Sequence, residues 1–272
     1  MSSIDIIIPI KGRPKLLHDR SLPSLLAQNL QTFKVTIVDD GSNQREFQQV
    51  EGIVEGYCQK GMHISVLQNQ GASGAAGARN FGFEATSGDY VLWFDSDDVL
   101  LNNKLELSMN LIESGPYDVA ITRAQHMVDS ALTDEFWGEP VAPNRGAYTF
   151  HFPYQTMCAL YRRSFLELRE IKWHEDIEMM NDWLFSNEII LKTNNWVFSP
   201  DVTAQYFVPT SSSESIGSTL TKKKIHSQQM ALLRIQSLIH KQNLKLDLIS
   251  KIKLARLSIE LKRQELFRNL FG

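Results

Sequence analysis

The chain has 272 residues, of which 43% are hydrophobic and 22% are charged. This composition is typical of a globular protein and unlike that of a disordered, collagen-like or coiled-coil chain. The formal net charge of -3 gives no strong field, so nucleic acid is not expected as a partner. The only two cysteines, Cys58 and Cys158, exclude a disulfide framework and a CxxC zinc site. There is no run of ~20 apolar residues and no basic leader at Met1, so we expect a cytoplasmic protein.

Short apolar runs alternate with helical stretches over the first 120 residues. The expected strands are Ile4–Ile10, Phe33–Asp39, His63–Leu67, Tyr90–Phe94 and Tyr117–Thr122. The expected helices are Leu16–Leu30, Glu46–Lys60, Ala75–Thr86 and Asn102–Glu113. This alternation predicts an α/β fold with a parallel sheet, whose ligands bind at the carboxyl ends of the strands.

The second half of the chain is less regular. Between Gln125 and Pro153 we expect loops and edge strands, and then helices at Arg162–Arg169 and at about Met179–Lys192. The serine-rich stretch Thr210–Thr219 is typical of a linker or a lid. The last fifty residues have a helical pattern.

Three carboxylates follow the expected strand that ends at Phe94, in the sequence Asp95-Ser96-Asp97-Asp98. Such a cluster is costly unless a cation or ligand uses it, and carboxylates prefer hard cations such as Mg²⁺ or Mn²⁺. The alternative interpretation is a solvated turn in which Asp98 caps the next helix.

Two further clusters occupy equivalent places after earlier strands. In Asp39-Asp40-Gly41-Ser42, a carboxylate could accept the imide N–H of uracil, or the residues could simply build a turn. The small residues from Gly71 to Arg79 and Asn80 allow close backbone approach by an anion. Arg79 would then hold a diphosphate, or pair with a neighbouring aspartate.

Together the three clusters resemble the family 2 glycosyltransferases, which have the GT-A fold. That family's pattern is an isoleucine-rich strand with proline, then VDDGS, then N-x-G-x-x-x-A-R-N-x-G, then G-[DE]-Y-[IV]-x-F-x-D-x-D-D. The matching segments, in the same order, are Ile6–Pro9, Val38–Ser42, Gly77–Gly82 and Gly88–Asp98. Lys11-Gly12 departs from the pattern, because the family usually has Tyr-Asn there.

The resemblance implies an inverting, metal-dependent transferase that moves a sugar from a UDP-sugar to a saccharide acceptor, free or lipid-linked. Bacterial surface polysaccharide or lipopolysaccharide synthesis is the expected setting. The implied GT-A catalytic domain covers residues 1–209, with a nucleotide-sugar half at 1–124 and an acceptor half at 125–209. A linker or lid at 210–220 and a basic helical extension at 221–272 follow.

The resemblance also implies roles for single residues. Asp40 would contact uracil with Pro9 and Asp39 beside it, while Arg79 and Asn80 would line the ribose and diphosphate. Asp95, Asp97 and Asp98 would form the DxD-type site, with Asp97 near the donor ribose or sugar. Asp98 would be the closest ligand of Mn²⁺ or Mg²⁺, with Asp97 as a second ligand.

The family carries its catalytic aspartate at the start of a helix in the second half. Asp176 and Asp182 are the two candidates. Trp173-His174-Glu175 fits the aromatic-x-Glu segment that often precedes the base, which favours Asp182 as base and leaves Asp176 as second choice. Asn181 departs from the glutamate that is common there, and an N-cap role for the aspartate is compatible with catalysis.

Some polar and aromatic residues of the second half have two interpretations. His226 could replace the histidine with which many family members reach the metal, or it could be a surface residue. The acceptor could be recognised by aromatic and histidine side chains of the middle segment, or these could serve packing alone. They are His126, Trp137, His151 and Tyr154.

From Lys222 to the end, twelve Lys and Arg residues stand against three Asp and Glu residues. Apolar residues are interleaved with these cations, so the segment could lie on an anionic membrane at the inner face of the plasma membrane. The alternative is a helical hairpin packed on the catalytic domain.

Two other functions stay open at this point. A nucleotidyltransferase would carry a basic, glycine-containing first loop, of which Lys11-Gly12-Arg13 is a faint form. A non-catalytic protein that binds nucleotide-sugars could also keep this fold.

Overall fold

The computed structural model describes residues 3–129, 131–138, 147–148, 154–208, 222–243 and 245–246, with 251–252, 255–256, 258–259 and 262–263. Its α-helices are α1 (Pro14–Leu16), α2 (Leu22–Leu26), α3 (Gln44–Cys58), α4 (Ala75–Glu84), α5 (Lys104–Glu113), α6 (Arg163–Leu168), α7 (Asn181–Lys192) and α8 (Lys222–Lys241). Its strands are β1 (Ile4–Ile10), β2 (Phe33–Asp39), β3 (Ile64–Gln68), β4 (Tyr90–Trp93), β5 (Val99–Leu100), β6 (Val119–Val128), β7 (Ala131–Trp137), β8 (Ala147–Tyr148), β9 (Ala159–Arg162), β10 (Trp196–Phe207) and β11 (Lys245–Leu246).

One large mixed sheet organises the molecule. Its strand order is β3-β2-β1-β4-β9-β6-β10-β5, with β7 beside β6. The run β3-β2-β1-β4 is parallel throughout, whereas β9 runs antiparallel to β4 and β6. The strand order reverses beside β1, and ligands of open α/β sheets bind at such a reversal. The predicted α/β fold with a mostly parallel sheet is confirmed.

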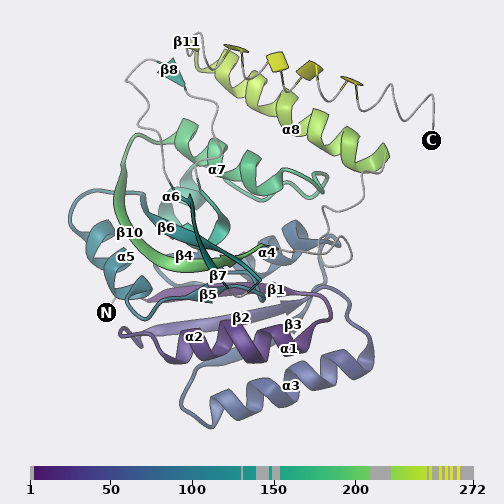
Figure 1. The fold of residues 1–272 in the computed structure, drawn as a ribbon, viewed down its shortest axis with the longest axis vertical. Coiled ribbons are helices and arrows are strands. Elements are labelled where there is room, and N and C mark those ends of the chain that lie inside the picture. Colours follow the sequence, from purple (N-terminus) through teal and green to yellow (C-terminus); the bar gives the residue numbers. More distant parts are fainter. Residues whose placement is uncertain are drawn as a thin grey trace.

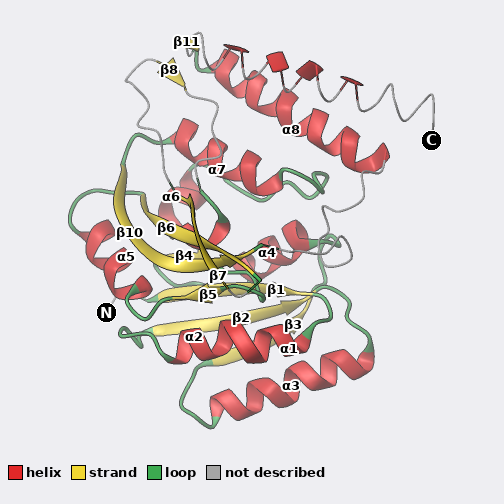
Figure 2. Cartoon of the chain, in the orientation of Figure 1, coloured by secondary structure: helices red, strands yellow, loops and turns green. Residues whose placement is uncertain are grey.

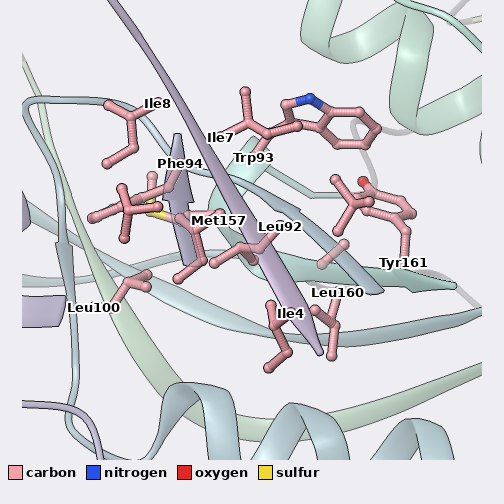
Figure 3. Close-up of a cluster of buried hydrophobic side chains, with 14 of the residues drawn as sticks. Ile4, Ile7, Ile8, Leu92, Trp93, Phe94, Leu100, Met157, Leu160 and Tyr161 are labelled. Atoms are coloured by element: carbon pink, nitrogen blue, oxygen red, sulfur yellow. The ribbon is translucent and has the colours of Figure 1, made fainter. Parts of the chain in front are cut away.

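Helices cover both faces of the sheet (Figures 1 and 2). Helices α2 and α3 lie on one side, and α6, α7 and α8 lie on the other. The central strand β1 is therefore buried from both faces, which explains its continuous isoleucine run. Figure 3 shows Ile4, Ile7 and Ile8 of β1 in the core, with Ile7 beside Trp93, and none of these four is more than 2% exposed.

The expected helix Leu16–Leu30 is present as far as Leu26, but it contains a π-helical turn. The structure has α1, a π-helical turn at Leu17–Ser21 and then α2, which ends at Leu26. Pro23 lies at the start of α2, where it has no N–H to donate and its ring would clash with a carbonyl four residues earlier. The wider turn accommodates this proline, and it also aims Arg20 and Ser21 at the acidic loop after β4.

The second half was predicted less completely. Edge strand β7 is confirmed, and α6 and α7 begin within two residues of their expected positions. Strand β9, inserted between β4 and β6, was not expected. His151 and the stretch Thr210–Thr219 lie outside the described residues. Among the helices that are described, none combines the length and apolarity needed to cross a membrane.

Candidate active site

The turn after β2 is built around Asp39. Its carboxylate accepts hydrogen bonds from the backbone N–H of Gly41 and Ser42 and from the Ser42 hydroxyl. Gly41 has φ +85°, which favours glycine. Both oxygens of Asp39, which is 2% exposed, therefore hold the turn that presents its neighbour.

Asp40 occupies the mouth of this turn. It accepts hydrogen bonds of 2.9 Å from the Asn69 side chain and from the Gly74 N–H, and the Lys11 ammonium lies 3.6 Å away. Each carboxylate oxygen has two lone pairs, so Asp40 retains acceptor capacity. Pro9 lies in β1 opposite Val38, directly beside this turn.

Helix α4 approaches the sheet closely because of its glycines. A Cβ on Gly82 would lie 2.5 Å from the Ile7 side chain, and one on Gly77 would lie 1.7 Å from the Ala72 carbonyl oxygen. Both contacts are shorter than real Cβ atoms allow. The glycines at these motif positions thus place α4 and its Arg79 against the sheet edge.

Arg79 is the centre of the site. Its Nη2 donates to Asp95 Oδ1 at 2.7 Å and its Nη1 to Asp182 Oδ1 at 3.3 Å, while the guanidinium lies 4.3 Å above the Trp173 ring. Burial alone would lower the pKa of Arg79, but Asp95 and Asp182 outweigh it and raise the pKa. Arg79 therefore carries a permanent charge that joins the acidic loop Asp95–Asp98 to the second half of the chain.

The acidic loop after β4 holds three carboxylates in different surroundings. Asp95 faces Arg79, Asp97 is 3.6 Å from Arg13 with its side chain 40% exposed, and Asp98 is 2% exposed. The Phe207 N–H donates to Asp98 Oδ1 at 3.0 Å. Burial, with Asp97 and Asp95 close by, raises the pKa of Asp98 well above its ordinary value.

The carboxylates of the acidic loop have the chemistry needed to bind a divalent cation. Asp97 and Asp98 offer hard carboxylate oxygens, and Mg²⁺ is usually held by one or two carboxylates together with substrate phosphates. No group of three or more His, Cys, Asp or Glu side chains in the described residues is arranged to hold an ion alone. A cation here would depend on the diphosphate for its remaining ligands.

Asp182 lies in the first turn of α7, and the Arg79 contact brings it to the acidic loop Asp95–Asp98. Loss of hydration raises the pKa of Asp182, Arg79 opposes this, and Asp95 adds to it. A carboxylate with a raised pKa, next to other charged groups, is suited to accept a proton.

Asp176, the second candidate base, has a different partner. Both of its oxygens accept hydrogen bonds from Arg234 of α8, at 2.9 and 2.6 Å. Burial would raise the pKa of Asp176, but Arg234 outweighs it and lowers the pKa. A carboxylate held in this way is a poor proton acceptor.

Asn80 joins two parts of the chain. Its Nδ2 donates to the Trp173 carbonyl and to Glu175 Oε1, both at 2.9 Å, and its Oδ1 accepts from the Trp173 N–H. The amide group thus fixes the segment that precedes Asp182. A ribose contact by Asn80 stays a prediction.

The sequence analysis did not assign three residues of this edge to the site. Arg13 faces Asp97, and Arg20 donates to the Asp97 carbonyl at 2.9 Å while stacking 3.8 Å from the centre of the Phe207 ring. Burial, together with Asp98 and Asp95, raises the pKa of Tyr206. The basic residues Arg13 and Arg20, which follow the first strand in the sequence, were the only pattern that could have indicated a contact with the acidic loop.

An aromatic cluster borders the site next to Tyr206. The His126 ring lies 5.6 Å from the Tyr206 ring and 5.0 Å from the Trp137 ring. Tyr154 is instead buried in the core beside Tyr161. His226 is an exposed residue of α8.

The fold has solved counterparts. TarS of Staphylococcus aureus in complex with UDP-GlcNAc superposes with a TM-score of 0.67 at 20% identity, covering 95% of this chain and 71% of that one. The mannosyltransferase PcManGT from Pyrobaculum calidifontis, in complex with GDP-Man and Mn²⁺, gives 0.60 at 15% identity, covering 98% and 82%. The fold class is therefore that of the GT-A glycosyltransferases.

The family model described as glycosyl transferase family 2 matches residues 5–169, more than half of the chain, so the chain belongs to this family. An uncharacterised glycosyltransferase of Haemophilus influenzae is 32% identical over 112 residues, 41% of this chain and 43% of its own. The poly(ribitol-phosphate) beta-N-acetylglucosaminyltransferase TarS of Staphylococcus aureus is 25% identical over 242 residues, 88% and 41%. The chain thus spans less than half of the length of either relative.

Proposed function

We propose that the chain is an inverting glycosyltransferase that moves a sugar from a UDP-sugar to a hydroxyl of a saccharide acceptor. One observation carries this proposal: Arg79 donates hydrogen bonds both to Asp95 of the acidic loop and to Asp182 of the second half. The carboxylate of Asp182, which can accept a proton, and the carboxylate of Asp95, in the proposed donor site, are therefore bound to the same guanidinium. Transfer needs that combination, whereas nucleotide binding alone does not.

The uracil of the donor would bind beside β2. Asp40, with its remaining acceptor capacity, would accept the imide N–H of uracil, while Asp39 keeps the turn in place and Pro9 lies beside it. The uracil N3–H lies between two carbonyl groups. The guanine N1–H lies between a carbonyl and an amino group, and the cytosine N3 carries no hydrogen. TarS binds UDP-GlcNAc, so UDP-GlcNAc is the first donor to test.

The chemistry follows from the charges around Arg79. Negative charge develops on the diphosphate oxygen as the sugar leaves, and the cationic guanidinium stabilises it. Mn²⁺ or Mg²⁺ held by Asp97 and Asp98 would add Lewis-acid stabilisation of the same group. Asp182 removes the proton from the acceptor hydroxyl, and Arg79 keeps its carboxylate oriented. One base and direct attack invert the anomeric centre without a covalent intermediate.

The acceptor would enter beside the aromatic cluster of His126, Trp137 and Tyr206 and carry a saccharide, free or lipid-linked. For a lipid-linked acceptor, we propose contact with an anionic membrane surface through exposed cations of the C-terminal region. These are Lys241, Lys251, Arg256, Lys262 and Arg263. Bacterial surface polysaccharide synthesis is the setting that the named relatives support.

The test is a donor screen in the presence of Mn²⁺. The protein is incubated with saccharide acceptors and UDP-GlcNAc, other UDP-sugars or GDP-mannose, and in a parallel reaction with UTP and a sugar 1-phosphate. Free nucleotide, pyrophosphate and glycosylated products are measured. Release of UDP with inversion at the anomeric carbon supports the proposal. Pyrophosphate release would instead identify a nucleotidyltransferase, and tight UDP binding without turnover would identify a binding protein.

A further inference from the structure

The segment 174–180, which precedes Asp182, lacks the usual means of fixing a helix start. No side chain caps the N-terminus of α7, and its N-cap residue, Met180, has φ 63°. A bulky residue in this left-handed region is strained unless its surroundings hold it there. Whatever holds this segment also sets the direction in which α7 begins.

Ser227 of α8 holds the segment just before the start of α7. Its hydroxyl oxygen accepts hydrogen bonds from the Glu178 N–H at 2.7 Å and from the Met179 N–H at 2.9 Å, and Ser227 is 3% exposed. Buried N–H groups without an acceptor are costly. A single hydroxyl of α8 thus satisfies two N–H groups directly before the strained residue.

Arg234, two turns further along α8, holds the other end of the segment. Besides its two hydrogen bonds to Asp176, its Nη1 lies 2.8 Å from His174 Nδ1. The opposite ring nitrogen of His174 lies 2.8 Å from Glu188 Oε2 on α7, and Lys192 pairs with Glu188 Oε1 at 2.7 Å. This chain of contacts ties α8, the segment and α7 together.

Apolar side chains pack α7 against α8. Trp183 and Leu184, which directly follow Asp182, lie in one buried cluster with Leu232 and Ile235 of α8. Figure 1 shows α8 lying against α7 at the top of the molecule. The buried face of α8 is therefore occupied by the helix that carries the candidate base.

We propose that α8 is part of the active-site framework, with Ser227 and Arg234 as positioning residues that hold Asp182 at Arg79 through segment 174–180. This proposal rests on the proposed role of Asp182 as base. It predicts that weakening either contact displaces Asp182 while the affinity for UDP, which we propose to bind at Asp40, stays unchanged.

The first arm of the test is amide hydrogen exchange, which needs no activity. Ser227→Ala should speed exchange of the Glu178 and Met179 amides by about tenfold, because each loses its acceptor. The matched control is Ser237→Ala, at an exposed serine of the same helix, which should leave these amides unchanged. Unchanged exchange in Ser227→Ala would overturn the proposal.

The second arm separates kcat from donor binding. Ser227→Ala and Arg234→Gln should each lower kcat by about tenfold, the scale expected for a misplaced general base, while the Kd of UDP stays within about twofold. Lys34→Gln, at an exposed cation of β2, is the charge-matched control. A kcat equal to that of the parent, or a parallel loss of UDP affinity, would contradict a positioning role.

The two variants also guard against misfolding. Ser227 is buried, whereas the Arg234 side chain is 31% exposed, so Arg234→Gln decides the outcome if Ser227→Ala fails to fold. If the parent transfers no sugar from any donor, the proposed function fails. The exchange arm still decides whether α8 holds the segment.

Discussion

Arg79 Nη1 and Asp182 Oδ1 lie 3.3 Å apart, although 103 residues separate them in the sequence. The same guanidinium donates to Asp95 at 2.7 Å, so one cation is shared by two carboxylates. Asp182 has the longer of the two bonds and the raised pKa. The arrangement orients Asp182 without taking away its ability to bind a proton.

Replacement of Asp182 tests the base directly. Asp182→Asn should lower kcat by about 10²–10⁴-fold, the range for a lost general base, with UDP-sugar affinity retained. Asp176→Asn should lower kcat by about tenfold at most, since it disturbs only the Arg234 contact. Steady-state kinetics with a Kd for UDP measure both effects. The opposite ranking would make Asp176 the base.

The raised pKa of Asp182 predicts a change in stability. The folded state binds this proton more tightly than the unfolded chain does, so the carboxylate destabilises the fold increasingly as pH rises through its folded pKa. Asp182→Asn should therefore melt at a higher temperature than the parent at pH 7. The difference should disappear near pH 4, and a constant difference would show that ionisation of Asp182 is not its cause.

Metal dependence is tested at Asp98. Asp98→Ala should abolish transfer, and EDTA should abolish it reversibly in the parent, because the diphosphate then loses its counter-charge. Calorimetric titration of Mn²⁺ in the presence of UDP should show binding in the parent and none in Asp98→Ala. Asp134→Ala, at an exposed carboxylate of β7, is the control. Full activity in EDTA, with Mn²⁺ and Mg²⁺ shown to be absent, would refute metal dependence.

Lys104 provides a second pH-dependent prediction, away from the site. It is fully buried, and burial lowers its pKa from 10.5 to about 8. The unfolded chain holds this proton more tightly, so the stability contributed by Lys104 rises with pH between these values, by a few kcal/mol at most. Lys104→Met should be most stabilised relative to the parent below pH 8. Urea denaturation across pH 7–10 would show this advantage shrinking, and a pH-independent difference would contradict it.

Membrane contact is tested with vesicles. Each exposed cation near an anionic surface contributes about 1 kcal/mol, so the chain should sediment with anionic vesicles at low salt and be released at high salt. A variant with Lys241, Lys251, Arg256, Lys262 and Arg263 changed to Gln should bind more weakly. Equal, negligible binding to anionic and neutral vesicles would leave the C-terminal region without a membrane role.

The helices and strands of the first half were predicted well, because residues close in the sequence determine where these elements begin and end. Strands β1 and β2 have the predicted bounds, since apolar runs that end in aspartate or glycine are distinctive. The π-helical turn at Leu17–Ser21, which contacts the acidic loop, and the inserted strand β9 involve packing with distant segments. The contacts of Asp176 with Arg234 and of Asp182 with Arg79 are long-range too. Sequence spacing ranked these two aspartates, but their partners could only be seen in three dimensions.

Asp98 accepts its backbone hydrogen bond from Phe207, which the ribosome adds 109 residues later. Strand β5, which follows Asp98 directly, likewise pairs with β10. During synthesis, the acidic loop therefore emerges long before the strand that completes it, and contacts of such sequence separation form late. A chain released before β10 would contain every glycine and aspartate of the donor motifs and still lack an assembled donor site. The acidic loop is thus completed only after β10 has been synthesised.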